Sequence, residues 1–331
     1  MKKWVVHIRS FFRFLRRLFI NGLVLRGYHK KIPTTIIIEP TNRCNLTCIC
    51  CPHGNAAKTG RPSGCMDPSL FDSIIGNIDT PVKEICLYLH GEPFLNKNLD
   101  YFVGQISQRA IMTTIYSNGY DIDLELLDKV LAYRKTRFSF SVDIISKTSY
   151  ESIRQPASYE KMIHCLRQIN SVFKSHRRTY ELSMITGDKD WEVVRGICDG
   201  LFAQYDCLKK ISFGSKFPWP EYFYTGELAE RLSKKRNLCN QISNSVAVYW
   251  NGDVTHCSYD YSGKLIIGNL SVDKLSEIYN STEARKIRAC HYLQRYSKLP
   301  ICKQCVLPRY KSSTFSVGRR KTKDKVYEKD S

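Results

Sequence analysis

Four cysteines fall within eight positions near the amino end of the chain, and this cluster constrains the fold more than any other stretch. They are Cys44, Cys48, Cys50 and Cys51. The apolar, β-branched run over residues 34–38 that precedes them is typical of a buried parallel strand. A strand that ends in a loop of thiols predicts a site at the carboxyl end of a barrel strand.

Three of these thiols, Cys44, Cys48 and Cys51, have the spacing C-x3-C-x2-C. Three thiolates can hold three irons of a four-iron cluster and leave one iron open to a small-molecule ligand, whereas a fully ligated cluster uses four cysteines. The competing interpretation is a zinc site with His53 as the fourth ligand, although structural zinc sites usually pair their ligands in C-x2-C or C-x2-H units. Cys50 could pack in the core or compete for the metal, and the spacing favours Cys51.

The cysteine loop resembles that of the radical S-adenosylmethionine (radical SAM) superfamily, in which it follows the first barrel strand. The resemblance implies a 4Fe–4S cluster on Cys44, Cys48 and Cys51, with SAM chelating the open iron through its amino and carboxylate groups. It implies an enzyme that cleaves SAM reductively to a 5′-deoxyadenosyl radical, which removes a hydrogen atom from the substrate. The electron would come from a donor such as flavodoxin or ferredoxin.

Composition agrees with a large cytoplasmic metalloprotein. The chain has 331 residues, of which 43% are hydrophobic, and this is enough for one large domain or two. It has fourteen cysteines and no signal-peptide pattern, which favours metal ligation in a reducing cytosol over disulfides. Cys86, Cys165 and Cys198 lie in apolar patterns and are expected in the core.

The net charge of +20 is concentrated at the two ends of the chain. Residues 1–31 hold nine Lys and Arg and no acid, and residues 309–331 hold eight Lys and Arg against three acids. The body between them is therefore only mildly cationic, which argues against a nucleic-acid-binding protein. We expect the basic tail, 309–331, to be disordered or to act as a contact arm.

Residues 4–19 have the pattern of an amphipathic basic helix. Large apolar side chains recur on one face, and Arg9, Arg13, Arg16 and Arg17 fall on the other. This pattern is typical of a helix that lies on an anionic membrane surface, and the arginines exclude a spanning helix. We therefore expect residues 1–31 either to make peripheral contact with the inner face of the membrane or to pack on the barrel.

Residues 32–216 alternate between strand and helix patterns. This alternation predicts an α/β fold in which a parallel sheet with right-handed crossovers forms an open, partial (β/α)6 TIM-like barrel. The core of the radical SAM family has the same architecture. The predicted strands are Thr34–Glu39, Glu84–His90, Met112–Ser117, Arg137–Asp143, Tyr180–Thr186 and Lys210–Ser215, and the predicted helices lie near 67–79, 98–109, 122–133, 147–174 and 190–204. Asp67, Asp121 or Asp123, and Ser158 are the expected helix caps.

The second predicted strand ends in His90-Gly91-Glu92-Pro93, which resembles the G-G-E-P motif of the family with a histidine in place of the first glycine. The resemblance implies that Glu92 accepts a hydrogen bond from the methionyl amine of SAM and that Gly91 allows a close backbone approach. Without the family, Glu92 reads as an acid at a helix amino terminus.

The next two strand ends carry four further residues that the resemblance assigns to SAM. Ser117 and Asn118 would lie near the ribose, and Ser141 and Arg154 around the ribose and carboxylate, where a guanidinium can donate two parallel hydrogen bonds. The structural alternatives are an ordinary Asn-Gly turn and an exposed helical arginine.

A composition shift near Phe217–Pro220 and a helix-like stretch over 226–236 lead to a second cysteine-rich module, 217–308. It contains Cys239, a predicted hairpin with a type I′ turn at Asn251-Gly252 that ends at Cys257, a helical segment over 271–289, and the pair Cys302 and Cys305. This pattern resembles the SPASM extension of radical SAM enzymes in its shorter form, called twitch. The resemblance implies that these four thiols ligate one auxiliary 4Fe–4S cluster suited to electron transfer, and the alternative is a zinc ribbon.

The resemblance favours a dehydrogenase of a sugar or cyclitol alcohol, in which the auxiliary cluster accepts an electron from the substrate. The alternative within enzymes is a maturase that modifies a peptide or protein, and a glycan is a further candidate substrate. A hypothesis of another class is a non-catalytic zinc- or cluster-binding protein attached to membrane or nucleic acid through its basic ends. The sequence marks no catalytic residue beyond the cluster that binds SAM.

Overall fold

The computed structural model describes residues 33–52, 59–185, 191–214, 239, 241–303, 305, 315–319 and 328–329. The predictions for residues 1–31, for His53 and for the segments 217–220 and 226–236 lie outside the described residues. Within the described ranges, no helix combines the length and the apolar character that a membrane span requires.

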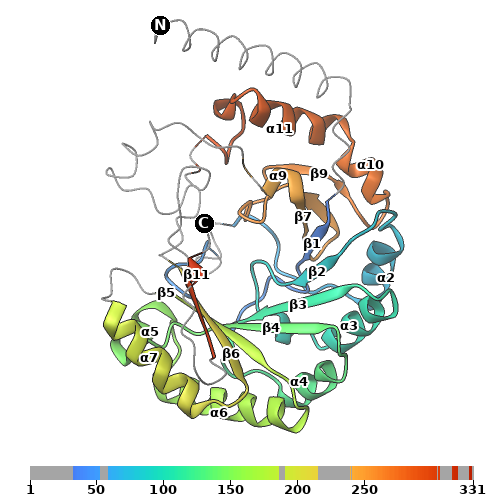
Figure 1. The fold of residues 1–331 in the computed structure, drawn as a ribbon. Coiled ribbons are helices and arrows are strands. Elements are labelled where there is room, and N and C mark those ends of the chain that lie inside the picture. Colours follow the sequence, from blue (N-terminus) through green and yellow to red (C-terminus); the bar gives the residue numbers. More distant parts are fainter. Residues whose placement is uncertain are drawn as a thin grey trace, which may run out of the picture.

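Six parallel strands form the centre of one sheet, and they follow one another in chain order (Figure 1). They are β1 (Thr35–Ile38), β2 (Glu84–Leu87), β3 (Met112–Ser117), β4 (Thr136–Ser141), β5 (Tyr180–Ile185) and β6 (Leu208–Gly214). Each strand lies beside its successor and is joined to it through a helical segment. The sheet stays open because β1 and β6, the first and last of the six, do not pair with each other. The predicted α/β class and the open, partial barrel are confirmed.

The helices cover the outer face of this sheet. They are α2 (Pro68–Gly76), α3 (Leu99–Gln108), α4 (Leu124–Leu131), α5 (Lys147–Ile153), α6 (Tyr159–Ser175) and α7 (Trp191–Gln204). Asp67, Asp123 and Ser158 accept hydrogen bonds from backbone N–H groups of the first turn and so cap α2, α4 and α6, as predicted.

The single helix predicted over 147–174 is wrong, because α5 ends at Ile153 and α6 begins at Tyr159. Pro156 lies between them. Proline has no N–H to donate and disfavours helical backbone in the residue before it, so one helix cannot run through this position.

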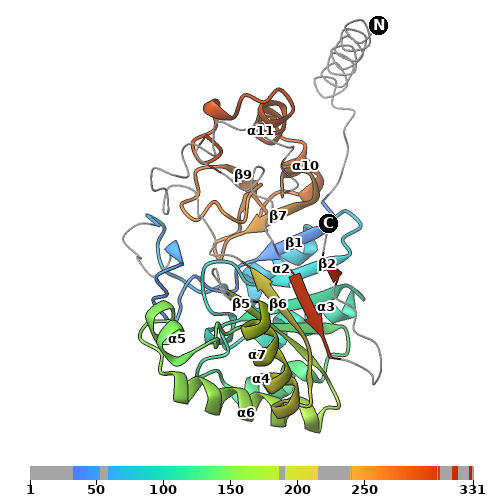
Figure 2. The same ribbon diagram turned by 60° about the vertical axis from the view of Figure 1, so that its left-hand side comes forward.

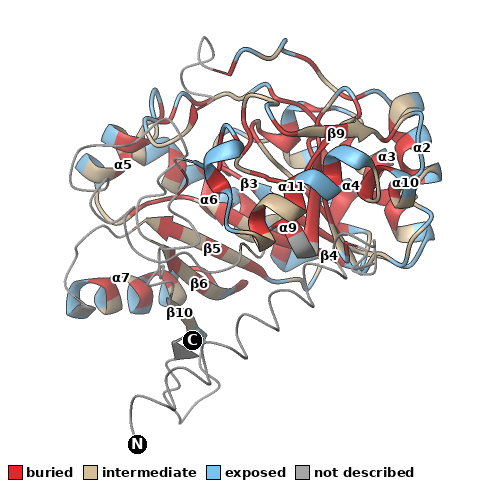
Figure 3. Ribbon diagram, turned by 90° about the horizontal axis from the view of Figure 1, so that it is seen from above, coloured by how far each residue is buried: buried red, intermediate tan, exposed pale blue. Residues whose placement is uncertain are grey.

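The two faces of the sheet differ in polarity. On β4, Phe138 and Phe140 point to the helices and contact the ring of Phe173 on α6, with ring centroids 5.2 Å and 6.1 Å apart. Ser139 and Ser141 alternate with them and are half-buried on the inner face (Figure 3). The main apolar core therefore lies between sheet and helices, and the inner face of β4 keeps polar groups.

The cysteine-rich module extends the same sheet on the far side of β1 (Figure 2). Strand β7 (Ser245–Val248) pairs in parallel with β1, and β8 (Asp253–Thr255) and β9 (Ile266–Asn269) follow as antiparallel neighbours. The helices of the module are α9 (Gln241–Asn244), α10 (Leu275–Tyr279) and α11 (Thr282–Tyr292), where the sequence predicts one helical segment over 271–289.

The turn between β7 and β8 differs from the predicted type I′ turn. Tyr249 N–H donates to the carbonyl of Asp253, and Gly252 has a positive φ of 88° whereas Asn251 does not. A type I′ turn needs positive φ at both central residues, so this turn is a three-residue connection closed by a glycine in the left-handed region. The hairpin itself is as predicted.

The basic tail contributes two short strands. β10 (Phe315–Gly318) pairs antiparallel with β6, and β11 (Glu328–Lys329) pairs with β10. The sequence predicts no regular structure here. The pairing covers the open edge of β6, whose backbone groups would otherwise have only water as a partner.

Candidate active site

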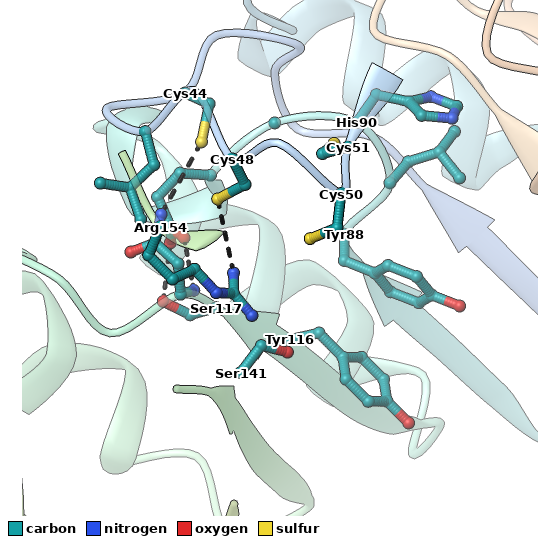
Figure 4. A pocket seen from close by; sticks show the side chains of 15 residues that line it. Cys44, Cys48, Cys50, Cys51, Tyr88, His90, Tyr116, Ser117, Ser141 and Arg154 are labelled. Carbon is teal, nitrogen blue, oxygen red and sulfur yellow. Dashed lines mark hydrogen bonds between the residues drawn. The ribbon is translucent and has the colours of Figure 1, made fainter. Parts of the chain in front are cut away.

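A pocket with about 680 Å³ of empty space, counted out to its open mouth, lies at the carboxyl ends of β1 to β4 (Figure 4). All nine residues predicted for the first cluster and for SAM contribute to its lining. They are Cys44, Cys48, Cys51, Gly91, Glu92, Ser117, Asn118, Ser141 and Arg154. The fold thus brings together side chains that are up to 110 positions apart in the sequence.

The cysteine loop is held against the end of α5. Thr47 N–H donates to the carbonyl of Gln155 at 2.6 Å, and Ile49 N–H donates to the carbonyl of Ile153 at 3.0 Å. None of the fourteen cysteines, each of which lies in the described part of the chain, forms a disulfide. Burial raises the pKa of both Cys44 and Cys50 to about 11, so these thiols stay protonated until a metal displaces the proton.

Glu92 is a fully buried carboxyl group in the wall of this pocket. Its Oε1 accepts from the Ser117 hydroxyl at 2.8 Å and from Phe94 N–H at 3.2 Å, and its Oε2 accepts from Asn118 N–H at 2.7 Å. Burial raises the pKa of Glu92 to about 7, against the opposing effect of these donors. Glu92 also caps the 3-10 helix Pro93–Leu95, as expected of an acid at a helix amino terminus.

Asn118 links the end of β3 to the cysteine loop. Its side-chain Nδ2 donates to Oδ1 of Asn45 at 2.8 Å and lies 3.7 Å from Sγ of Cys44, while its Oδ1 accepts from Tyr120 N–H at 2.8 Å. The Ser117 hydroxyl group donates its hydrogen bond to Glu92. Both side chains therefore orient other groups of the pocket, a role that the Asn-Gly turn alone does not reveal.

Arg154 forms a buried ion pair with Asp143. Its Nε donates to Oδ2 of Asp143 at 2.8 Å, its Nη2 lies 2.6 Å from the same oxygen, and its Nη1 lies 3.7 Å from Sγ of Cys48. Burial would lower the pKa of Arg154, but the charge and hydrogen bond of Asp143, together with the nearby thiols of Cys48 and Cys50, raise it. The guanidinium is thus a fixed positive charge directed at the cysteine loop (Figure 4).

Gly91 is required by the cysteine loop. A Cβ at this position would lie 2.3 Å from the carbonyl oxygen of Thr41 and 2.6 Å from that of Arg43, and both are backbone atoms. Glu92 N–H donates to the Arg43 carbonyl at 2.8 Å. The close approach predicted for Gly91 is therefore an approach to the chain's own loop.

Two tyrosines that the sequence analysis did not single out form one wall of the pocket. Tyr88 follows β2, and Tyr116 lies on β3. Their ring centroids are 4.6 Å apart, and their ring planes are at 57° (Figure 4). The Tyr116 side chain is exposed. The alternation of β3 could have indicated it, since Tyr116 is the one exposed residue in an otherwise buried strand end.

A buried charge network joins this pocket to the cysteine-rich module. Glu39 accepts two hydrogen bonds from Arg61, at 2.8 Å and 2.9 Å, and one from the backbone N–H of Trp250 at 3.2 Å. His90 Nδ1 lies 3.2 Å from Glu39. Burial would raise the pKa of Glu39, yet the hydrogen bonds from His90 and Arg61 lower it to about 2. No local pattern in the sequence indicates this network, because its members come from four separate segments.

A second cavity of about 430 Å³ lies in the cysteine-rich module. Its lining includes all four thiols predicted for the auxiliary site, Cys239, Cys257, Cys302 and Cys305. Burial and the three neighbouring thiols raise the pKa of Cys257 far above its usual range. The rest of the lining combines apolar side chains with Gln241, Tyr259 and two histidines, and the four thiols are its largest set of soft metal ligands.

These two sites and the open barrel define a protein with two iron–sulfur centres on an α/β scaffold. The chain matches the radical SAM superfamily over residues 38–195 and the SPASM iron–sulfur cluster-binding domain over residues 239–306. It belongs to the radical SAM superfamily and is an enzyme of that type, so the predicted family is confirmed.

Among curated proteins, the S-adenosyl-L-methionine-dependent 2-deoxy-scyllo-inosamine dehydrogenase of Niallia circulans is 22% identical over 280 residues, which are 83% of this chain and 93% of the relative. Two solved structures share the fold. BtrN in complex with AdoMet and 2-DOIA has a TM-score of 0.55 at 22% identity, covering 82% of this chain and 92% of BtrN. SuiB of Streptococcus suis bound to its precursor peptide SuiA has a TM-score of 0.62 at 14% identity, covering 79% and 68% of the two chains.

The domain matches define the cofactors. A radical SAM domain takes a 4Fe–4S cluster and SAM, and a SPASM domain takes auxiliary iron–sulfur centres. The chain's own residues fit this chemistry: thiols line both cavities, and the first cavity also contains a buried carboxyl group and a fixed guanidinium. The alternative of a non-catalytic zinc-binding protein is superseded.

Proposed function

We propose that this enzyme dehydrogenates a secondary alcohol of a sugar or cyclitol. The balanced reaction is alcohol plus SAM to ketone, 5′-deoxyadenosine, methionine and one proton. The electron that starts SAM cleavage comes from an external donor such as flavodoxin or ferredoxin, and the substrate returns one electron when its carbon radical loses a proton and becomes the ketone. The likeness to a SAM-dependent cyclitol dehydrogenase over most of both chains supports this reaction.

The observation that carries the proposal is the set of four thiols in the second cavity. Cys239, Cys257, Cys302 and Cys305 would ligate every iron of one cluster and leave none open to chelate a substrate. Such a centre is suited to accept an electron, which is what removal of the second electron from an alcohol requires.

In the first cavity we assign Cys44, Cys48 and Cys51 as the ligands of the cluster that binds SAM. When bound, this cluster and SAM supply the radical that takes the substrate hydrogen. The positive charge of Arg154, 3.7 Å from Cys48, would stabilise the thiolate form of the ligands and orient the carboxylate of SAM.

The remaining assignments concern the amino end and the ribose of SAM. Glu92 is held in place by Ser117 and by the backbone of Asn118, and it would accept a hydrogen bond from the methionyl amine. Ser117 and Asn118 then act by orienting Glu92 and the cysteine loop, and Ser141, in the lining of the same pocket, would contact the ribose. Gly91 contributes by letting β2 approach that loop.

The substrate would bind on the inner face, between the tyrosine wall and Ser141. Aromatic rings stack on the C–H face of a sugar or cyclitol, and hydroxyl groups bond its rim. The alternative, peptide modification, is supported by the fold shared with SuiB bound to its precursor peptide and with anSMEcpe bound to a peptide.

The test is reconstitution under argon, followed by addition of SAM, dithionite and a panel that includes 2-deoxy-scyllo-inosamine, amino sugars and short peptides. The proposal expects 5′-deoxyadenosine and ketone in equal amounts. Deoxyadenosine formed without any oxidised alcohol would reject it, and a modified peptide would support the maturase alternative.

We also propose that the enzyme is a cytoplasmic protein that makes peripheral contact with the inner face of the membrane through residues 1–31. Exposed cations lie at the amino ends of the parallel strands, the edge at which the chain enters β1, and would add to the attraction of an anionic surface. They are Lys83, Arg109, Lys135, Arg177 and Lys209. The proposed domains are 1–31, the core 32–216, the auxiliary-cluster domain 217–308 and the tail 309–331.

A further inference from the structure

We propose that His291 donates a hydrogen bond to the sulfur of Cys302 and thereby raises the reduction potential of the auxiliary cluster. Nε2 of His291 lies 3.3 Å from Sγ of Cys302, inside the cavity that the four thiols line. The imidazole is buried, with 3% of its surface exposed. The inference rests on the proposed ligand set of the second cavity.

The position of this imidazole is set by the local structure. His291 lies in the last turn of α11, and Tyr296, in the 3-10 helix Tyr296–Lys298, packs edge-on against its ring at a centroid distance of 4.9 Å and an angle of 84°. The contact is therefore built into the fold and does not depend on a flexible side chain.

The second histidine of the cavity, His256, has a different environment. Nη1 of Arg288 lies 3.3 Å from its Nε2, and arginine can only donate, so that nitrogen is an acceptor facing a cation. Arg288 also donates to the carbonyl of Tyr279 at 2.6 Å. His291, and not His256, is thus the ring whose Nε2 is directed at a ligand sulfur.

The chemical effect follows from the charge on the sulfur. A thiolate ligand accepts an N–H hydrogen bond more strongly than a thiol does, and the bond withdraws negative charge from the cluster. Because the reduced cluster carries one more negative charge than the oxidised one, it gains more from the bond, and the potential rises. A higher potential favours uptake of the electron that the substrate releases. His291 is therefore a positioning residue that touches no substrate.

The test uses the full chain with Cys44, Cys48 and Cys51 replaced by alanine, so that the auxiliary cluster is the only paramagnetic centre. His291→Phe removes the donor, and His291→Gln keeps an N–H of similar reach. His164→Phe, at an exposed position on α6, is the matched control. The midpoint potential is measured by redox titration followed by electron paramagnetic resonance, with iron content determined for each protein.

We expect a more negative potential in H291F, a potential near the parent value in H291Q, and no change in H164F. In the parent, exchange into deuterated water should remove one proton coupling in the electron–nuclear double resonance spectrum, and H291F should lack that coupling. Equal potentials in H291F and parent at equal iron content would overturn the proposal. If H291F fails to hold iron, the absence of an exchangeable coupling in the parent would overturn it instead.

The result separates from that of the proposed function. A shifted potential in an enzyme that oxidises no alcohol would keep the role of His291 and reject the dehydrogenase. Alcohol oxidation by the enzyme, together with an unshifted potential in H291F, would support the dehydrogenase and reject the role of His291.

Discussion

Arg154 and Asp143 form an ion pair beside the cysteine loop, in which two nitrogens of the guanidinium approach the same carboxylate oxygen at 2.8 Å and 2.6 Å. The pair is buried, with 12% of the arginine side chain and 1% of the aspartate side chain exposed. Each partner would be an uncompensated charge without the other.

Arg154→Ala should therefore destabilise the apoprotein by about 3–5 kcal/mol, because it leaves the carboxylate of Asp143 buried and unpaired. It should also weaken SAM binding by at least about tenfold if the guanidinium meets the carboxylate of SAM. Urea unfolding and equilibrium dialysis measure the two effects. Unchanged SAM affinity would remove Arg154 from the cofactor site, and Lys147→Ala, at an exposed ion pair, is the control.

Glu92 predicts a pH dependence of stability. Its folded-state pKa of about 7 lies above the ordinary value of 4.5, so the unfolded chain loses this proton first as pH rises. The contribution of Glu92 to the free energy of unfolding is therefore fully present below about pH 4.5. It decreases by about 3 kcal/mol in total as the pH rises from 4.5 to 7.

Glu92→Gln should remove this loss and make the apoprotein more stable than the parent at pH 8 but not at pH 4.5, while weakening SAM binding. Urea unfolding at both pH values tests the first part. If the difference in free energy of unfolding between the Glu92→Gln variant and the parent were the same at both pH values, the raised pKa would be contradicted.

Gly91→Ala should disrupt the cysteine loop, because its Cβ would overlap two backbone oxygens that cannot move independently. We expect a loss of about 2 kcal/mol or more and less iron bound after reconstitution. Gly76→Ala is a matched control, since a Cβ there meets nothing within 4 Å and lies in a helix. It should be neutral or slightly stabilising. Equal iron content in the two variants would contradict the tight fit at Gly91.

Cys50 and Cys51 predict opposite results on substitution. Cys51→Ala should lose the cluster that binds SAM, whereas Cys50→Ala should keep it. Iron analysis and electron paramagnetic resonance of the reduced protein are the measurements, and the three-cysteine variant described above gives the signal of the auxiliary cluster for subtraction. Loss of the signal in C50A alone would transfer the ligand role to Cys50.

Deletion of residues 1–28 should release the enzyme from vesicles that contain anionic lipid. Vesicle sedimentation at low and high salt measures binding, and vesicles of neutral lipid are the control. A truncated protein that still sediments with anionic vesicles would reject this segment as the membrane contact.

Local rules in the sequence were sufficient for most of the core. The β-branched run before Cys44 and the cap at Asp67 act over a few residues, and both are found where the sequence predicts them. The cysteine cavities were also accessible, because the spacing of each cysteine group reflects a fixed ligand geometry.

What escaped prediction depends on contacts between distant segments. The pairing of β10 with β6 joins residues about 100 positions apart, and the local sequence around Phe315 predicts neither the strand nor its partner. Arg61 reaches Glu39 only because two loops meet above the sheet. His291 gave no signal, since a single histidine near a helix end is ordinary until the position of Cys302 is known.

The parallel pairing of β1 with β7 has a consequence for engineering. The amide ladder of one short strand is shared by the segment that leads to the first thiol loop and by the hairpin that leads to Cys257. If the auxiliary module is moved to another barrel, that barrel must therefore offer a strand that can pair with β7 as β1 does. A truncation before β7 would leave the outer edge of β1 without a hydrogen-bonding partner, and an unpaired strand edge promotes self-association.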